Sequence, residues 1–242
     1  MAATFFISDL HLALQASNVE AQKLDKLQVL FERIGNEGGA LYLLGDILDY
    51  WLEFHHVIPK EFSRFFCMLS SLVQQGVQVF YVAGNHDFEL GSYFMQSLGI
   101  TTAYGINEVT IEGKRFFVAH GDGLGKGDTG YKIFARLIRT RFSRFVLQWL
   151  HPDLTIGFMK WVSQLSREHK PTNSSFEVDR LLHFAHSLRA EQEFDYFVCG
   201  HNHVQGVHEL AEGSRYLNLG TWINGNYSYG VFKEGKFDFF DL

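Results

Sequence analysis

Five times along this chain, a short apolar run ends abruptly in a cluster of aspartate, asparagine or histidine, usually beside glycine. The five segments span residues 4–11, 40–46, 77–87, 114–122 and 194–203. Near-continuous apolar runs of this length are typical of central strands that are covered on both faces. The pattern therefore predicts an α/β core in which each strand presents polar side chains at its carboxyl end.

Stretches with helical spacing separate the first three segments. Residues 62–73 form one such stretch, and residues 19–34 form another, with apolar Leu24, Leu27, Val29, Leu30 and Ile34. Alternating strands and helices imply right-handed crossovers and parallel neighbours. We therefore expect the polar clusters to gather at one end of the sheet, where open α/β sheets bind ligands. After Gly206, alternating segments joined by "AEGS" and "KEGK" predict antiparallel hairpins that form a second sheet packed on the first.

The composition is that of an ordinary soluble globular protein, with 46% hydrophobic and 20% charged residues. The chain has no Gly/Ser-rich or low-complexity linker, so we predict a single domain over residues 1–242 that contains an insertion. The N-terminus lacks a basic region and the chain has no long apolar span, which predicts a cytoplasmic protein. Cys67 and Cys199 are expected to be buried free thiols.

The polar clusters together supply the donor atoms of a metal site. They comprise Asp9, His11, Asp46, Asn85, His86, Asp87, His120, Asp122, His201 and His203. Carboxylate, amide and imidazole donors suit Mn²⁺, Fe²⁺ or Zn²⁺, and the absence of cysteine argues against a structural thiolate zinc site. Residues two apart on an extended segment point the same way, so Asp9 with His11, and His201 with His203, can each grip one ion. One such pair would be weak support among 12 histidines, but five clusters in the same context are not.

In their order along the chain, these motifs resemble those of the calcineurin-like metallophosphoesterases. The match covers D-x-H at 9–11, G-D at 45–46, G-N-H-D at 84–87, H-G-D at 120–122 and G-H-x-H at 200–203. The resemblance implies a sandwich of two mixed β-sheets flanked by helices, in α/β/β/α order, with two metal ions at the strand ends.

The resemblance also assigns roles to the strand-end residues. One ion would be held by Asp9, His11 and His203, and the other by Asn85, His120 and His201. Asp46 would bridge the two ions, because two close cations need an anionic ligand between them. His86 would act on the substrate, and Asp87 would orient its ring. A non-catalytic scaffold is the rival interpretation, but its degeneration should cost ligands or His86, and this sequence retains them all.

Between the fourth and fifth clusters lies a predicted helical insertion, at about residues 123–193. Residues 126–170 carry nine Lys/Arg against three Asp/Glu, although the net charge of the chain is −6. Apolar residues recur there at near-helical spacing, which is consistent with a helical hairpin that has a solvated basic face. Alternatively, the apolar face lines an acyl-chain cleft and the basic face meets an anionic membrane surface. The overall acidity argues against nucleic acid as a partner.

The stretch "HGDGLGKGDTGYKIF", the basic region and "LGDILDYWLE" are similar to the UDP-2,3-diacylglucosamine hydrolases of lipid A biosynthesis. That resemblance implies hydrolysis of a pyrophosphate bond to UMP and 2,3-diacylglucosamine 1-phosphate, typically with Mn²⁺. It also implies a peripheral position on the inner face of the bacterial inner membrane. Besides Asn85 and His86, the residues expected to contact the UDP-linked diacylated sugar are Asp128, Ser166 and Lys170.

One position departs from the best-known branch of these hydrolases, which has arginine where this chain has His86. The alternative is a soluble metallophosphodiesterase or nucleotide pyrophosphatase with a non-lipid substrate. No obligate protein partner is predicted.

Overall fold

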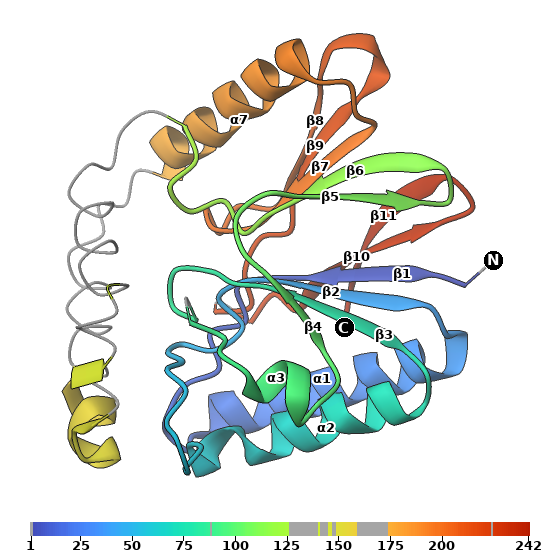
Figure 1. The fold of residues 1–242 in the computed structure, drawn as a ribbon. Coiled ribbons are helices and arrows are strands. Elements are labelled where there is room, and N and C mark those ends of the chain that lie inside the picture. Colours follow the sequence, from blue (N-terminus) through green and yellow to red (C-terminus); the bar gives the residue numbers. More distant parts are fainter. Residues whose placement is uncertain are drawn as a thin grey trace.

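The computed structural model places two β-sheets face to face, with helices on both outer sides (Figure 1). It describes residues 2–87, 89–125, 140, 145–146, 149–158, 174–223 and 225–242, and for residues 174–179 it describes the backbone only.

The first sheet has six strands in the order β11-β10-β1-β2-β3-β4. These are β1 (Thr4–Ile7), β2 (Ala40–Leu44), β3 (Gln78–Val82), β4 (Thr101–Ala103), β10 (Ser228–Lys233) and β11 (Lys236–Asp241). Strands β1 to β4 run parallel, and the β10–β11 hairpin is added antiparallel to β1.

The second sheet has five strands in the order β5-β6-β7-β9-β8. They are β5 (Asn107–Ile111), β6 (Lys114–Val118), β7 (Tyr196–Cys199), β8 (Gly206–Glu209) and β9 (Arg215–Asn218). Strands β6, β7 and β9 are parallel, whereas β5 and β8 are antiparallel to their neighbours at the two edges.

The helices cover the outer faces of the sheets (Figure 1). They are α1 (Asn18–Glu37), α2 (Ser63–Gln74), α3 (Tyr93–Gln96) and α7 (Ser174–Glu191), with short 3₁₀ turns η1 (Lys60–Phe62) and η2 (Ala211–Gly213). α1 and α2 pack on the first sheet, and α7 packs on the second. In the described part of the chain, no helix has both the length and the apolar character needed to cross a bilayer.

The alternation of side chains along each strand explains the continuous apolar runs. In β1, Phe5 packs toward the helices and Phe6 packs between the sheets. In β7, Val198 packs between the sheets and Phe197 packs under α7. Both faces of these strands are covered, so neither face needs polar residues. This arrangement confirms the expected α/β/β/α sandwich.

Helix α1 follows local signals at both ends. The Ser17 side chain caps the first turn by accepting from the Glu20 N–H, and Gly38 ends the helix with a φ of 68° and an N–H that donates to Ile34. The buried face differs from the predicted one at two positions. Val29 is 56% exposed, whereas Lys23, just before the first predicted apolar position, is only 4% exposed.

Two expectations about topology need correction. The five strands that end in polar clusters do not share a sheet, because β6 and β7 belong to the second sheet. The hairpins after Gly206 also divide, with β8 and β9 in the second sheet and β10 and β11 in the first. The chain changes sheets between β4 and β5 and again between β9 and β10, and a strand covered on both faces carries no sequence mark of the sheet to which it belongs.

The expectation of two buried thiols holds for one of them. Cys199 is buried, and burial raises the pKa of its thiol to about 12. Cys67 is exposed on α2, so that part of the prediction was wrong. The helix buries Phe65, Phe66 and Leu69, and Cys67 lies on the opposite side of this stripe.

Candidate metal centre

The loops that follow β1, β2, β3, β6 and β7 bring together the side chains predicted to bind metal. These are Asp9, His11, Asp46, Asn85, His120, His201 and His203. The ends of three strands of the first sheet thus meet the ends of two strands of the second. Their donor atoms form two clusters that share one carboxylate.

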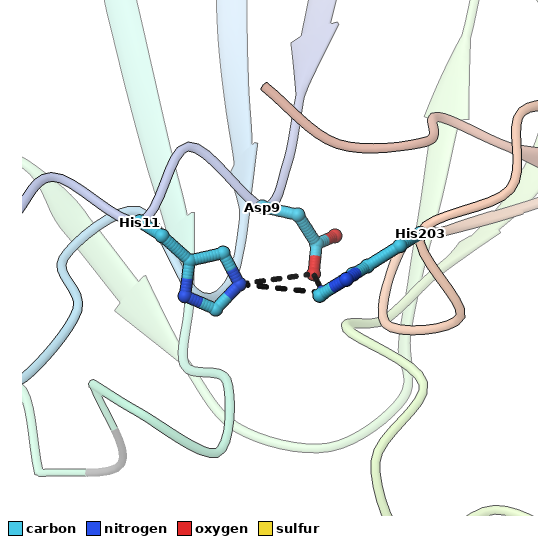
Figure 2. A group of neighbouring side chains, drawn as sticks. All are labelled: Asp9, His11 and His203. Atoms are coloured by element: carbon cyan, nitrogen blue, oxygen red, sulfur yellow. Dashed lines mark hydrogen bonds and ion pairs between the residues drawn. The ribbon is translucent and has the colours of Figure 1, made fainter. Parts of the chain in front are cut away.

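The first cluster consists of Asp9, His11 and His203 (Figure 2). Asp9 Oδ1 lies 3.2 Å from His203 Nε2 and 3.8 Å from His11 Nε2, and the two Nε2 atoms are 3.3 Å apart. Asp9 is fully buried, yet its Oδ1 accepts no hydrogen bond. A buried carboxylate oxygen without a hydrogen bond is costly unless a cation satisfies it. Three donor atoms that converge in this way fit a divalent ion.

The second cluster consists of Asn85, His120 and His201. Asn85 Oδ1 lies 3.1 Å from His120 Nε2 and 3.0 Å from His201 Nδ1, and these two nitrogens are 3.3 Å apart. His120 Nδ1 is 2.9 Å from the Leu44 carbonyl, which can only accept, so Nδ1 carries the proton. In the neutral form of the ring, the lone pair therefore lies on Nε2 and points into the cluster, as a metal-binding histidine requires.

Asp46 lies between the two clusters. Its Oδ2 is 3.3 Å from His120 Nε2 in the second cluster and 3.7 Å from His11 Nε2 in the first. Its Oδ1 accepts a hydrogen bond from the His86 N–H at 2.8 Å, which fixes the carboxylate plane. This is the position that a bridging carboxylate would occupy.

The backbone is unusual at the candidate ligands. Of the eight non-glycine residues with positive φ in the described part of the chain, five are candidate ligands: Asp9 (53°), His11 (46°), Asp46 (52°), His201 (72°) and His203 (62°). Each such conformation costs roughly 1–3 kcal/mol and persists only where the surroundings fix it. That concentration of strain indicates a functional site rather than an ordinary set of loops.

Hydrogen bonds between the loops hold these conformations. The Asp9 and His11 N–H groups donate to the Gly45 and Asp46 carbonyls. The Asp9 carbonyl in turn accepts from Thr221 Oγ1 at 2.9 Å and from the Trp222 N–H at 3.1 Å. The loop after β1 is thus tied both to the loop after β2 and to the loop after β9.

Two glycines allow the carboxylates to approach the backbone. A Cβ atom at Gly84 would overlap the Asp46 carboxylate, and one at Gly200 would overlap the Asp9 carboxylate. Glycine is required at both positions because any larger residue would collide with a carboxylate.

The charges of the site support cation binding. Burial alone would raise the pKa of Asp46, but His120, His86 and His11 outweigh that effect and hold the pKa well below its usual range. Burial likewise opposes protonation of His11, but Asp49, Asp9 and Asp46 raise the pKa of that ring to about 9. Asp46 therefore stays ionised, and a metal ion would replace the proton on His11.

The contacts of His86 and Asp87 differ from those expected. Asp87 does not orient His86; its carboxylate accepts from the N–H groups of Gly84 at 2.7 Å, Ile47 at 2.8 Å and Asp46 at 3.1 Å, and from the Tyr81 hydroxyl. The Asp87 carboxylate therefore ties the loop after β2 to the loop after β3.

Asp49 takes the place expected for Asp87. Its carbonyl lies 2.8 Å from His86 Nδ1, and its carboxylate oxygen Oδ1 lies 3.5 Å from His11 Nδ1. Sequence reasoning missed Asp49, although its place three residues after Asp46 in "GDILD" was a signal.

The remaining predicted residues fall into two groups. Asp122 lies at the end of the strand β6 segment and is among the charges that raise the pKa of His120. Asp128, Ser166 and Lys170 lie outside the described residues.

Comparisons with known proteins agree with this geometry. Residues 3–205 match the family model described as calcineurin-like phosphoesterase. A UDP-2,3-diacylglucosamine hydrolase of Porphyromonas gingivalis is 34% identical, and the alignment covers 94% of this chain and 92% of that protein. Proteins of the same name from Actinobacillus succinogenes and Yersinia enterocolitica are 27% and 28% identical, over 92% and 91% of this chain and the same shares of theirs. The solved structure of a novel archaeal phosphodiesterase shares the fold, with a TM-score of 0.52, 13% identity and 99% coverage of both chains.

The contacts of Asp87 predict a structural role that can be measured. Asp87→Asn places an amide donor among N–H and O–H donors, so we expect it to lower the free energy of unfolding by roughly 1–3 kcal/mol. Urea unfolding of the metal-free protein measures this without a contribution from bound ions. The matched control is Asp238→Asn on the exposed side of β11, which should change the free energy by less than about 0.5 kcal/mol. An Asp87→Asn protein as stable as the control would contradict this assignment.

Proposed function

The chain belongs to the calcineurin-like phosphoesterase family, and on that premise we propose that it hydrolyses UDP-2,3-diacylglucosamine to UMP and 2,3-diacylglucosamine 1-phosphate in lipid A biosynthesis. The observation that carries the proposal is the likeness to proteins named UDP-2,3-diacylglucosamine hydrolase over nearly the whole chain. The intact set of candidate ligands favours a metal-dependent hydrolase over a non-catalytic scaffold.

Within this proposal, the two clusters hold two divalent cations. Asp9, His11 and His203 would hold one ion, Asn85, His120 and His201 the other, and Asp46 would bridge them. Oxygen and imidazole nitrogen donors without thiolate suit Mn²⁺, Fe²⁺ or Zn²⁺, and Mn²⁺ is the proposed metal because the resemblance to the UDP-2,3-diacylglucosamine hydrolases implies it. Such a pair of cations supplies, when bound, a nucleophile derived from water at neutral pH and positive charge beside the phosphoryl oxygens.

His86 would then act on the substrate side of the site. Its Nδ1 faces the Asp49 carbonyl and so carries a proton, which leaves Nε2 to accept or donate the second one. Burial lowers the pKa of His86, so the neutral ring is favoured before substrate binds. A phosphoryl group would restore the protonated form, and Nε2–H would then stabilise the transition state or help the leaving phosphate depart.

Exposed apolar side chains in the described part of the insertion support a lipid substrate. Trp149 is 70% exposed, Leu154 66% and Phe145 58%. The Trp149 ring lies 6.3 Å from the His55 ring, in the loop that also exposes Val57 and Ile58. Although the Phe145 and Trp149 rings lie against each other, with centroids 5.7 Å apart, these side chains stay exposed and are available to contact acyl chains.

We further propose that the protein associates with the inner face of the inner membrane. The basic residues between 126 and 170 would meet anionic headgroups, since basic amphipathic segments are attracted to such surfaces. Asp128, Ser166 and Lys170 are proposed substrate contacts on the strength of the sequence resemblance alone.

A comparison of two substrates tests the lipid proposal. With Mn²⁺, kcat/KM for UDP-2,3-diacylglucosamine should exceed that for UDP-N-acetylglucosamine by at least about 100-fold, because two acyl chains contribute binding energy that the second substrate lacks. Release of UMP measures both reactions. Equal kcat/KM values for the two substrates would contradict the proposed acyl-binding role and favour a nucleotide pyrophosphatase with a non-lipid substrate.

The role of His86 is tested by pairing it with a ligand. His86→Ala should lower kcat by roughly 10²- to 10⁴-fold while the protein keeps both metal ions. His201→Ala, the matched histidine variant, should instead lose metal. Metal content by plasma mass spectrometry and UMP release distinguish the two variants. If His86→Ala lost both ions, the histidine would be a ligand and this assignment of roles would be wrong.

A further inference from the structure

Lys23 is buried next to the candidate metal centre. Lys23, on the second turn of α1, is 4% exposed, and its Nζ donates to the His11 carbonyl at 3.0 Å and to Glu20 Oε1 at 2.9 Å. Lysine is seldom buried unless its charge is paired. Here the ammonium is paired, and it donates directly to the backbone of a candidate ligand.

Glu20 completes the contact with the same loop. Its Oε2 accepts from the Ala13 N–H at 2.9 Å, while its own N–H donates to Ser17 Oγ at 3.2 Å. In an ordinary capping box the glutamate would reach back to the N–H of its own cap residue. In this protein it bonds to the loop after β1, so the ion pair grips residues 11–13 at two points.

The loop after β1 needs these two contacts because its backbone is strained at His11. His11 has a φ of 46°. The loop after β2 bonds to the His11 and Leu12 N–H groups and, through the Asp49 N–H, to the Leu12 carbonyl. The Lys23 bond acts instead on the His11 carbonyl. Without that bond, the Leu12 N–H alone would hold the peptide after His11, and a turn of that peptide toward ordinary extended backbone would carry Nε2 away from Asp9 and His203.

We propose that the Lys23–Glu20 ion pair positions His11 for metal binding. The pair has no net charge, so it supplies the donor and the acceptor that fix the loop without placing an unpaired ammonium beside two cations. The inference rests on the two-cation site of the proposed function, but it does not depend on which phosphoester is hydrolysed.

Mn²⁺ binding to the metal-free full-length protein tests the proposal. Lys23→Met keeps the length of the side chain and removes the donor, so one of the two ions should bind roughly 10- to 100-fold more weakly and the other should bind as in the wild type. Glu20→Gln keeps an oxygen for the Ala13 N–H but leaves Lys23 unpaired, and it should weaken the same ion. The matched control is Arg33→Met, which removes the Arg33–Glu37 ion pair farther along α1 and should change neither affinity.

Free Mn²⁺ measured by electron paramagnetic resonance gives the affinities, and hydrolysis of bis-p-nitrophenyl phosphate gives a second readout. In Lys23→Met, the Mn²⁺ concentration for half-maximal rate should rise while kcat at saturating Mn²⁺ stays near that of the wild type. Wild-type affinity for both ions, with only a lower melting temperature, would overturn the proposal by showing that the pair merely stabilises α1. If Lys23→Met does not fold, Glu20→Gln decides, and its binding both ions as the wild type does would overturn the proposal equally.

Discussion

The buried carboxylate of Asp46 is the interaction on which the rest of the site depends. Its Oδ2 faces His11 from the first sheet and His120 from the second, and its Oδ1 holds the backbone of His86. A carboxylate buried among imidazole rings stays ionised only with positive charge beside it, and protons on those rings or bound cations can supply that charge. The two sheets therefore meet at a point whose electrostatics favour cations.

The fold places strained backbone at that point and supports it from outside. Asp9, His11 and Asp46 have left-handed conformations, and bonds between loops hold them in place. Asp87, with Tyr81, holds the loops after β2 and β3 together. Lys23 and Glu20, both on α1, hold the loop after β1. Conformational freedom is thus removed when the protein folds, so the ligands are already arranged when metal arrives.

Much of this site could be predicted from sequence because the signal for each part of it lies within a few consecutive residues. An apolar run followed by Asp, Asn or His predicts both a strand and the side chains at its end, and in the structure the seven candidate ligands lie close together. What could not be predicted depends on tertiary packing. The sequence of a strand that is covered on both faces does not show to which of the two sheets the strand belongs. Asp87 is adjacent to His86 in sequence, yet the ring faces Asp49, because neighbouring residues at a strand end point in different directions. The burial of Lys23 could not be predicted, because it depends on the His11 carbonyl, which lies close to Lys23 only in the folded chain.

The central claim is that one carboxylate joins two cation sites, and the magnetic coupling of bound Mn²⁺ tests it most directly. Two Mn²⁺ ions held by the two clusters with the Asp46 carboxylate between them should give an exchange-coupled electron paramagnetic resonance spectrum with two ions per chain. Asp46→Ala should abolish that coupling. A wild-type protein that binds a single ion, or two magnetically independent ions, would contradict the account.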